Sequence, residues 1–179
     1  MSNMEELLNY DLDYLRLEKD NEQNKLNGYY DNIEACQNRI RECKRMGAHD
    51  FYDDIKELEE EIYNDTDGIT SSTHRISLLN SVIFYKLEKL ILADEEPELT
   101  EEEANYLNNK YTPIVDEAVK ERNDDQERYN SMMYDDLSDD DKLLEFNTCA
   151  SDLKDSEEKY NRYLKILNYA QNCISQKTI

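Results

Sequence analysis

The stretch FYDDIKELEEEIYNDTDGITSSTHRISLLNSVIFYKLEKLILA, Phe51 to Ala93, decides the fold of this protein. It places an aliphatic residue at every seventh position, and a second apolar column accompanies the first. The first column holds Ile55, Ile62, Ile69, Ile76, Ile83 and Leu90, and the second holds Phe51, Leu58 and Leu79. A period of seven keeps apolar side chains on one stripe of an α-helix. The stretch therefore predicts one long helix that packs along a partner.

One segment of this helix is rich in poor helix formers, namely NDTDGITSST from Asn64 to Thr73. Because the period of seven continues from Ile62 through Ile69 to Ile76, we expect the helix to run through the segment without interruption. A break within it is the alternative.

The residues before Phe51 predict the partner helix. An unbroken spacing of four and three residues runs over roughly 40 residues, or ~60 Å of helix. Lys19 and Glu22 are the polar members of this column; the others are Leu8, Leu12, Leu15, Leu26, Tyr29, Ile33, Cys36, Ile40 and Cys43. We expect Gly47 to end the helix with a left-handed residue and Asp50 to cap the next one. So short a connection predicts that the two helices are antiparallel.

The second half of the chain predicts two more helices. Thr100 and Glu103 form a capping box, so a third helix begins at Glu101. Thr112 followed by Pro113 predicts a kink or a restart in that helix. Its apolar face is thin and consists of Val115, Ala118, Tyr129 and Met132.

The fourth helix is predicted over about 139 to 175, and it begins within DDLSDDDKLL, Asp135 to Leu144. Ser138 occupies the N-cap position, and Asp139, Asp140 and Asp141 occupy the first turn, where negative charge favours the helix dipole. Its apolar column comprises Phe146, Ala150, Leu153, Tyr160, Leu164, Leu167 and Ile174.

These patterns predict an all-α protein of long antiparallel, heptad-patterned hairpins that form an elongated four-helix bundle or coiled coil. Three glycines, two prolines and no tryptophan in 179 residues agree with long helices. We expect one domain over residues 1–179, with a hairpin at 1–94, a linker at 95–99 and a hairpin at 100–179. Residues 77–93 and 163–174 are apolar on most sides, so they predict packing of the two hairpins at one end or pairing of two copies of the chain.

The chain is strongly acidic, with 43 acidic and 21 basic residues and a net charge of −22. The charge is spread evenly, since the residues before Pro97 carry −12 and those from Pro97 onward carry −10. Phosphates attract basic surfaces, so direct binding of nucleic acid or of an anionic membrane is not expected.

Several features predict a reduced, cytoplasmic protein, in the host cytoplasm if a phage encodes it. No stretch reaches the ~18 apolar residues of a membrane span, and the acidic N-terminus lacks the pattern of a signal peptide. The four cysteines include no CxxC pair. Cys36 and Cys43 lie two helical turns, or ~10 Å, apart, which is too far for a disulfide.

The sequence holds little that predicts catalysis, a cofactor or a metal. Neither His49 nor His74 follows a glutamate by three residues, and no glycine-rich phosphate loop is present. The aspartate-rich stretches lack the glycine and glutamate positions of an EF-hand. We therefore expect a protein that is not an enzyme.

One near-match to an enzyme family involves two carboxylate pairs. Glu98 with Glu101, and Glu121 with Asp124, resemble the magnesium-binding pattern of all-α nucleotide pyrophosphatases of the MazG type, in which such pairs lie on facing helices. The first pair straddles a helix cap, and no basic substrate pocket is apparent. A pyrophosphatase function is therefore not the preferred hypothesis.

The acid excess favours a protein-binding function. Its candidate surface comprises Asp53, Asp54, Glu57, Glu60, Glu61, Asp135, Asp136, Asp139 and Asp140. Carboxylates at helical spacings of three and four lie ~5–6 Å apart and could enter a groove built for phosphates. The leading hypothesis is that this protein is an inhibitor that occupies the nucleic-acid channel of a basic partner by DNA or RNA mimicry. The protein resembles phage anti-restriction and anti-CRISPR proteins in charge and shape alone.

A coiled-coil adaptor or assembly protein, whose acidity keeps a long rod soluble, is the alternative. Tyrosines outside the apolar columns are candidate anchors for either function, although codon bias explains their number equally well. They are Tyr30, Tyr52, Tyr85, Tyr134 and Tyr163.

Overall fold

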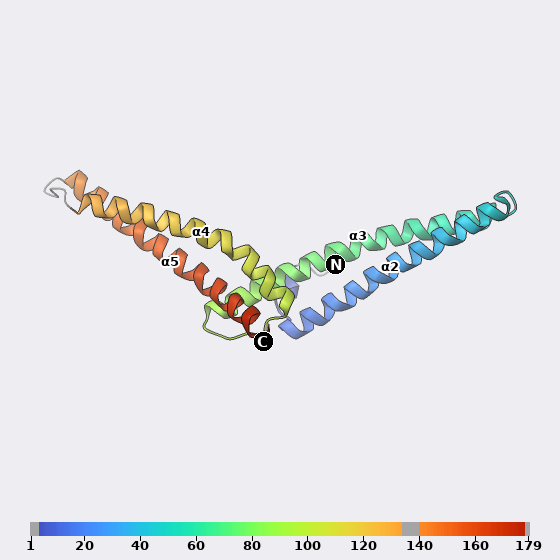
Figure 1. The fold of residues 1–179 in the computed structure, drawn as a ribbon, viewed down its shortest axis with the longest axis horizontal. Helices are drawn as coiled ribbons and strands as arrows, with labels where there is room; N and C mark the ends of the chain where they lie inside the picture. Colours follow the sequence, from blue (N-terminus) through green and yellow to red (C-terminus); the bar gives the residue numbers. More distant parts are fainter. Residues whose placement is uncertain (1–3, 134–139, 178–179) are drawn as a thin grey trace. The chain divides into compact units, whose positions relative to one another are not determined.

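The computed structural model describes residues 4–133 and 140–177. In these ranges the chain forms five helices and no strand, which confirms the predicted all-α class (Figure 1). The helices are α1 (Met4–Leu7), α2 (Leu12–Gly47), α3 (Tyr52–Leu92), α4 (Glu101–Met132) and α5 (Asp140–Lys177). The chain divides into two compact units, Met1–Lys86 and Leu87–Ile179, and α3 contributes residues to both. None of the described helices has an apolar stretch able to span a lipid bilayer.

The first long helix begins later than predicted. The short α1 ends at Leu7, and α2 starts at Leu12 with Asp11 as its N-cap. The Asp11 carboxylate accepts a hydrogen bond from the backbone N–H of Tyr14 at 2.7 Å. Aspartate at this position satisfies a backbone donor that has no partner inside the helix, so it starts a new helix where the apolar spacing alone indicates continuity.

In the first unit, α2 and α3 lie side by side along their length (Figure 1). At one end, Cys36 and Ile40 of α2 pack with Ile55 and Leu58 of α3 in a buried cluster that Cys43, Phe51 and Ile62 extend. Every residue of the predicted α2 column, from Leu12 to Cys43, is buried or half-buried, and this includes Lys19 and Glu22. The apolar column therefore lies on the face of α2 that the structure covers.

Polar contacts occupy the middle of this interface. Ser72 donates a hydrogen bond to Glu22 at 3.0 Å, and Lys25 pairs with the other oxygen of Glu22 at 2.6 Å. Asn32 donates to Asp65 at 2.6 Å. Polar side chains of α2 thus meet the polar segment of α3, and the half-buried Glu22 finds there a hydrogen-bonding partner in the buried Ser72.

The segment Asn64 to Thr73 is helical throughout, as predicted, and its glycine has a packing role. The ring of Tyr29 lies directly against Gly68, so that a Cβ atom added there would be 2.6 Å from Tyr29 Cζ. Thr66 and Thr70 donate hydrogen bonds to the carbonyls of Ile62 and Thr66 one turn earlier. A residue type that weakens an isolated helix is therefore required here by the close approach of the α2 ring.

The turn between α2 and α3 differs in detail from the prediction. Gly47 has a positive φ of +129°, so a glycine is needed at this position, as expected. Asp50 is not the N-cap of α3, since α3 begins at Tyr52 and the N–H of Ile55 donates to the carbonyl of Phe51. The helix starts one residue later than a cap at Asp50 would place it, because Asp50 takes part in the turn, where its N–H donates to the Gly47 carbonyl at 3.1 Å.

In the second unit, α4 packs along α5, and its start is as predicted. The Thr100 hydroxyl accepts from the N–H of Glu103, and the Glu103 carboxylate accepts from the N–H of Thr100 at 2.8 Å, which completes the capping box. The predicted restart at Pro113 is wrong, because α4 continues through this residue. Thr112 does not cap a new helix; its hydroxyl donates to the carbonyl of Asn108 within α4.

Small side chains are among the buried residues of α4 and α5. Ala104 and Ala118 of α4 are buried, and so are Cys149, Ser156 and Ala170 of α5. The predicted α5 column is mostly half-buried, with Leu167 its buried member. Large apolar side chains are buried as well, namely Leu107 and Tyr111 of α4 and Ile166 of α5, so the covered faces combine small and large residues.

The connection between α3 and α4 is fastened to α5. Asp94 adopts the left-handed conformation with φ of +62°, and the N–H of Glu95 donates to the carbonyl of Leu90, which closes the end of α3. Lys165 donates to the carbonyl of Leu92 and pairs with Asp94 at 2.6 Å. Tyr169 donates to the carbonyl of Pro97 at 2.8 Å. These contacts hold residues 92–97 against one face of α5.

Two glycine substitutions test the packing of Tyr29 on α3. Gly28→Ala on α2 meets no atom within 4 Å and should raise the free energy of unfolding by about 0.5–1 kcal/mol, because alanine favours the helix. Gly68→Ala should lower it by about 1 kcal/mol, since the Tyr29 ring must move. Urea unfolding followed by circular dichroism measures both. In a Tyr29→Ala background, Gly68→Ala should become stabilising; a loss there equal to that in the wild type would contradict the contact.

The half-buried Glu22 in the α2–α3 interface predicts that the stability of the protein depends on pH. The hydrogen bond from Lys25, with a second from Ser72, lowers the pKa of Glu22 below its ordinary value of 4.5. A lowered folded pKa contributes stability above the unfolded pKa, and this contribution is lost as the pH falls through the folded value. Wild type should therefore exceed Glu22→Gln in urea midpoint at pH 7, and the difference should shrink below about pH 4.5. An equal difference at pH 7 and pH 3 would show that Glu22 acts by packing alone.

Candidate acidic surface

The start of α3 exposes the predicted carboxylates because its opposite face is covered. Ile55 and Leu58 are buried in the cluster with α2 and Ile62 packs against it, so the intervening positions point outward. The described members of the predicted surface on α3 are all exposed: Asp53, Asp54, Glu57, Glu60 and Glu61. These five residues lie within nine consecutive positions of α3, from Asp53 to Glu61.

Four exposed carboxylates form a row along α3. Asp53, Glu57, Glu60 and Asp67 follow spacings of four, three and seven residues, and the exposed Asn64 occupies the position between the last two. Residues three and four apart are neighbours on a helix, with ~5–6 Å between their side chains, whereas seven residues separate Glu60 from Asp67 by ~10 Å. The row, named here the α3 row, extends over fifteen residues, with ~21 Å between its two ends. Asp67 was not part of the predicted surface.

The α3 row carries a high local charge. Eight acidic residues and one basic residue, Lys56, lie between Asp53 and Asp67. Lys56 approaches Glu60 at 3.7 Å, and both side chains are largely exposed, so solvent screens this ion pair. Seven net charges over ~21 Å correspond to about one per ~3 Å of helix. This density is close to the one charge per ~3.4 Å of a single nucleic-acid strand.

Glu61 differs from the other predicted residues because it faces α2. Its Oε2 atom accepts a hydrogen bond from the Cys36 thiol at 3.2 Å. Burial, and then this hydrogen bond, raise the pKa of Cys36. Glu61 therefore contributes charge to the edge of the surface while it takes part in the packing of the two helices.

The other predicted residues belong to the second unit. Asp140 is exposed in the first turn of α5, whereas Asp135, Asp136 and Asp139 lie outside the described residues, as do Ser138 and Tyr134. Each unit carries its own excess of acid, with a net charge of −9 for Met1–Lys86 and −13 for Leu87–Ile179.

Most of the negative charge of the described chain lies at its surface. All of its acidic residues are exposed except seven, namely Glu18, Glu22, Asp65, Glu88, Glu103, Asp125 and Asp152. Glu103 is the buried one, and its carboxylate serves the capping box of α4. Since 43 acids face 21 bases, one-to-one pairing of every cation still leaves 22 carboxylates in excess.

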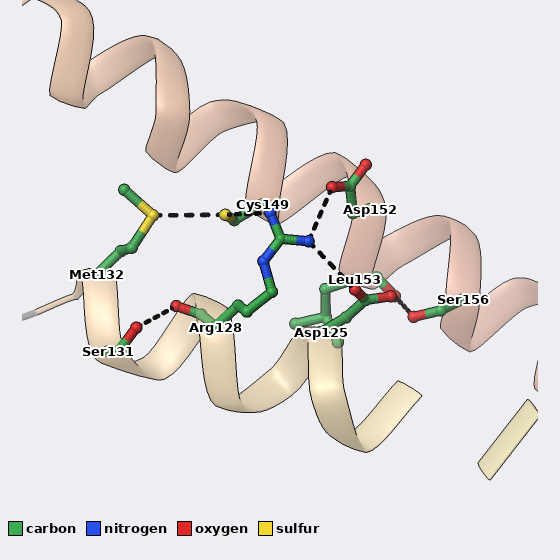
Figure 2. A network of polar contacts seen from close by, with 8 residues as sticks. All are labelled: Asp125, Arg128, Ser131, Met132, Cys149, Asp152, Leu153 and Ser156. Atoms are coloured by element: carbon green, nitrogen blue, oxygen red, sulfur yellow. Dashed lines mark hydrogen bonds and ion pairs between the residues drawn. The ribbon is translucent and has the colours of Figure 1, made fainter. Parts of the chain in front are cut away.

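The acidic group between α4 and α5 is partly neutralised. Arg128 of α4 pairs with Asp125 at 3.7 Å and with Asp152 of α5 at 3.6 Å, and its guanidinium also lies 3.7 Å from the Cys149 sulfur (Figure 2). Beside this network, Lys159 pairs with Glu121. These cations bind the two helices together, so the carboxylates here serve the packing of the second unit rather than a free surface.

The described residues hold no group of three or more His, Cys, Asp or Glu side chains that could bind a metal ion. The carboxylate pairs that resemble the MazG pattern do not face each other. Glu101 and Glu121 lie on the same helix, twenty residues or ~30 Å apart, and Glu98 precedes that helix. The four cysteines are free, with Cys36 and Cys149 buried.

The tyrosines divide into packed and exposed groups. Tyr163, predicted as an anchor, instead packs on Tyr111 with ring centroids 5.8 Å apart. Tyr30, Tyr52 and Tyr85 are exposed, as an anchor requires. Sequence reasoning missed Tyr63, which is 76% exposed. Its position next to Ile62 in the apolar column, with glutamates one turn earlier, is the signal that could have found it.

Comparison of the chain with protein-family models, with curated proteins and with solved structures finds no match.

The contact between Cys36 and Glu61 predicts a change in thiol reactivity. Removing the negative charge with Glu61→Gln should lower the Cys36 pKa and speed its alkylation by iodoacetamide at neutral pH, since the thiolate is the reactive form. Mass spectrometry of the Cys36 peptide gives the rate, and Cys43 is the internal reference. Glu59→Gln, a neighbouring glutamate that is exposed, is the matched control. Equal Cys36 rates in the two variants would show that Glu61 does not hold the thiol.

Proposed function

We propose that this protein is a non-enzymatic inhibitor that binds a basic partner and occupies its nucleic-acid channel. The observation that carries the proposal is the α3 row, a set of exposed carboxylates fixed along one side of a helix. The whole segment from Asp53 to Asp67, which contains the row, carries about one net charge per ~3 Å, a density that matches a single strand and is roughly half that of duplex DNA. A channel lined with lysine and arginine would accept such a surface.

The placement of cations supports side-on binding. Arg39, Arg41, Lys44 and Arg45 are exposed at the end of α2, within three turns of the connection to α3. The negative end of the α2 helix dipole stabilises these cations near the C-terminus of the helix. A basic channel would repel them, so the partner contacts the side of α3 rather than the tip formed by the turn.

The proposal includes the finer organisation of the fold. We infer an antiparallel, heptad-patterned α2–α3 hairpin, within a chain of two hairpins at 1–94 and 100–179. Two contacts support the antiparallel arrangement: Glu22 meets Ser72, and Cys36 meets Glu61. The later residue of α2 contacts the earlier residue of α3, as antiparallel helices require. Such a stiff element keeps the carboxylates in place, which spares the entropy of ordering a flexible chain on binding.

An adaptor function is the second candidate, and one apolar row favours it. Tyr10, which precedes α2, and Tyr14 in the first turn of α2 stack with ring centroids 4.4 Å apart, and both are exposed, as is Leu17 one turn beyond Tyr14. Exposed aromatic residues at helical spacing suit a protein partner that binds through apolar contacts. Binding of this kind would change little with salt.

Charge reversal of the α3 row tests the inhibitor proposal. The protein is used to capture partners from a cell lysate, and a captured nuclease or polymerase is assayed with increasing protein at several salt concentrations. Asp53→Lys, Glu57→Lys and Glu60→Lys together should weaken inhibition by roughly tenfold or more, since three ion pairs become repulsive. Inhibition by the wild type should weaken as salt increases.

The matched control reverses the same number of exposed acids on α2, namely Asp20, Asp31 and Glu34. It changes the net charge equally but leaves the α3 row intact, so its loss of inhibition should be much smaller. Equal losses in the two variants would show that total charge, and not the row, is responsible. Inhibition that persists unchanged at high salt would argue against mimicry and for the adaptor.

A further inference from the structure

Tyr63 is the most exposed large apolar side chain of the described chain, at 76%. It makes no hydrogen bond or ring contact with the rest of the described chain. Packed tyrosines elsewhere behave differently, since Tyr111 contacts Tyr163 and Tyr129 contacts Phe146. The fold therefore gives no reason for an aromatic ring at this position.

Three carboxylates surround the Tyr63 ring on the surface of α3. Glu59 and Glu60 precede it by four and three residues, and Asp67 follows it by four, so all three are its neighbours on the helix. Glu59, Glu60 and Tyr63 also line one shallow hollow, together with Lys56 and Asn64. The hollow lies on the face of α3 that α2 leaves uncovered.

An aromatic face bordered by carboxylates suits an arginine side chain. A guanidinium is planar, stacks on an aromatic ring and donates paired hydrogen bonds to a carboxylate, whereas an ammonium does so less well. An arginine packed on a tyrosine ring occurs inside the second unit, where the Arg122 guanidinium lies 4.6 Å from the centroid of the Tyr160 ring. The seven net negative charges between Asp53 and Asp67 favour a basic partner at this face.

We propose that Tyr63, with Glu59, Glu60 and Asp67, is an arginine-binding subsite by which an arginine-rich segment of a basic protein docks on α3. The inference rests on the proposed function, because it specifies how the same acidic face recognises its partner. The carboxylates supply attraction over distance, and the ring supplies a short-range contact that salt screens less. Tyr63 thus makes the surface selective for arginine over lysine.

A fluorescently labelled hexa-arginine peptide, compared with hexa-lysine, probes the subsite by anisotropy at moderate salt. The wild type should bind hexa-arginine more tightly. Tyr63→Ala should weaken hexa-arginine binding by about two- to fivefold and narrow the difference between the peptides, while Tyr63→Phe should retain it. Circular dichroism should show an unchanged melting curve for each variant, since the side chain is exposed.

Tyr52→Ala is the matched control. Tyr52 is 67% exposed on the same helix, but its neighbours at three and four residues are Ala48, His49, Ile55 and Lys56, with no carboxylate among them. Its removal should leave hexa-arginine binding unchanged. Equal losses in the Tyr52 and Tyr63 variants, or no loss in either, would overturn the subsite.

The outcome separates the subsite from the proposed function. If charge reversal of the α3 row abolishes inhibition of a captured enzyme while Tyr63→Ala binds hexa-arginine like the wild type, the subsite is wrong and the inhibitor proposal stands. If Tyr63→Ala selectively loses hexa-arginine binding while charge reversal leaves inhibition intact, the subsite stands and mimicry is wrong.

Discussion

The packing of α2 on α3 is the constraint on which the acidic surface depends. Ile55 and Leu58 are buried with Cys36 and Ile40, and burial of such side chains removes apolar surface from water at about 25 cal/mol per Å². Because a helix has 3.6 residues per turn, covering this stripe sets the direction of every other side chain. The carboxylates of the α3 row are exposed because the apolar residues occupy the opposite, covered face of the helix.

The polar middle of the same interface shows how a long helix tolerates weak helix formers. Gly68 admits the Tyr29 ring, and Ser72 and Asp65 meet Glu22 and Asn32. A continuous apolar seam would allow one helix to slide along the other in steps of seven residues. Polar partners that are satisfied in one register alone oppose such a slip, since displaced groups would be covered without hydrogen bonds.

Acidic residues have two different roles in this chain. Between α4 and α5, Arg128 joins Asp125 to Asp152, so the charges hold helices together. Along the α3 row, Lys56 is the single cation, and the charge faces solvent. Repulsion among these neighbours reduces stability, and the row is retained on a helix whose other face is well covered. A surface of this kind is suited to binding a cation-rich partner, which is the basis of the function proposed here.

The sequence by itself determined the all-α class, the continuity of α3 through Asn64–Thr73 and the capping box at Thr100, because helical period and capping chemistry are local. It also placed Asp53, Asp54, Glu57 and Glu60 on an exposed face, since these positions are out of phase with the isoleucines. The tertiary structure alone decided the N-cap of α2 at Asp11, the contact of Glu61 with Cys36, the ring of Tyr29 against Gly68 and the high exposure of Tyr63. These features depend on which atoms of neighbouring segments come close in space. The apolar period of a single helix does not specify those distances.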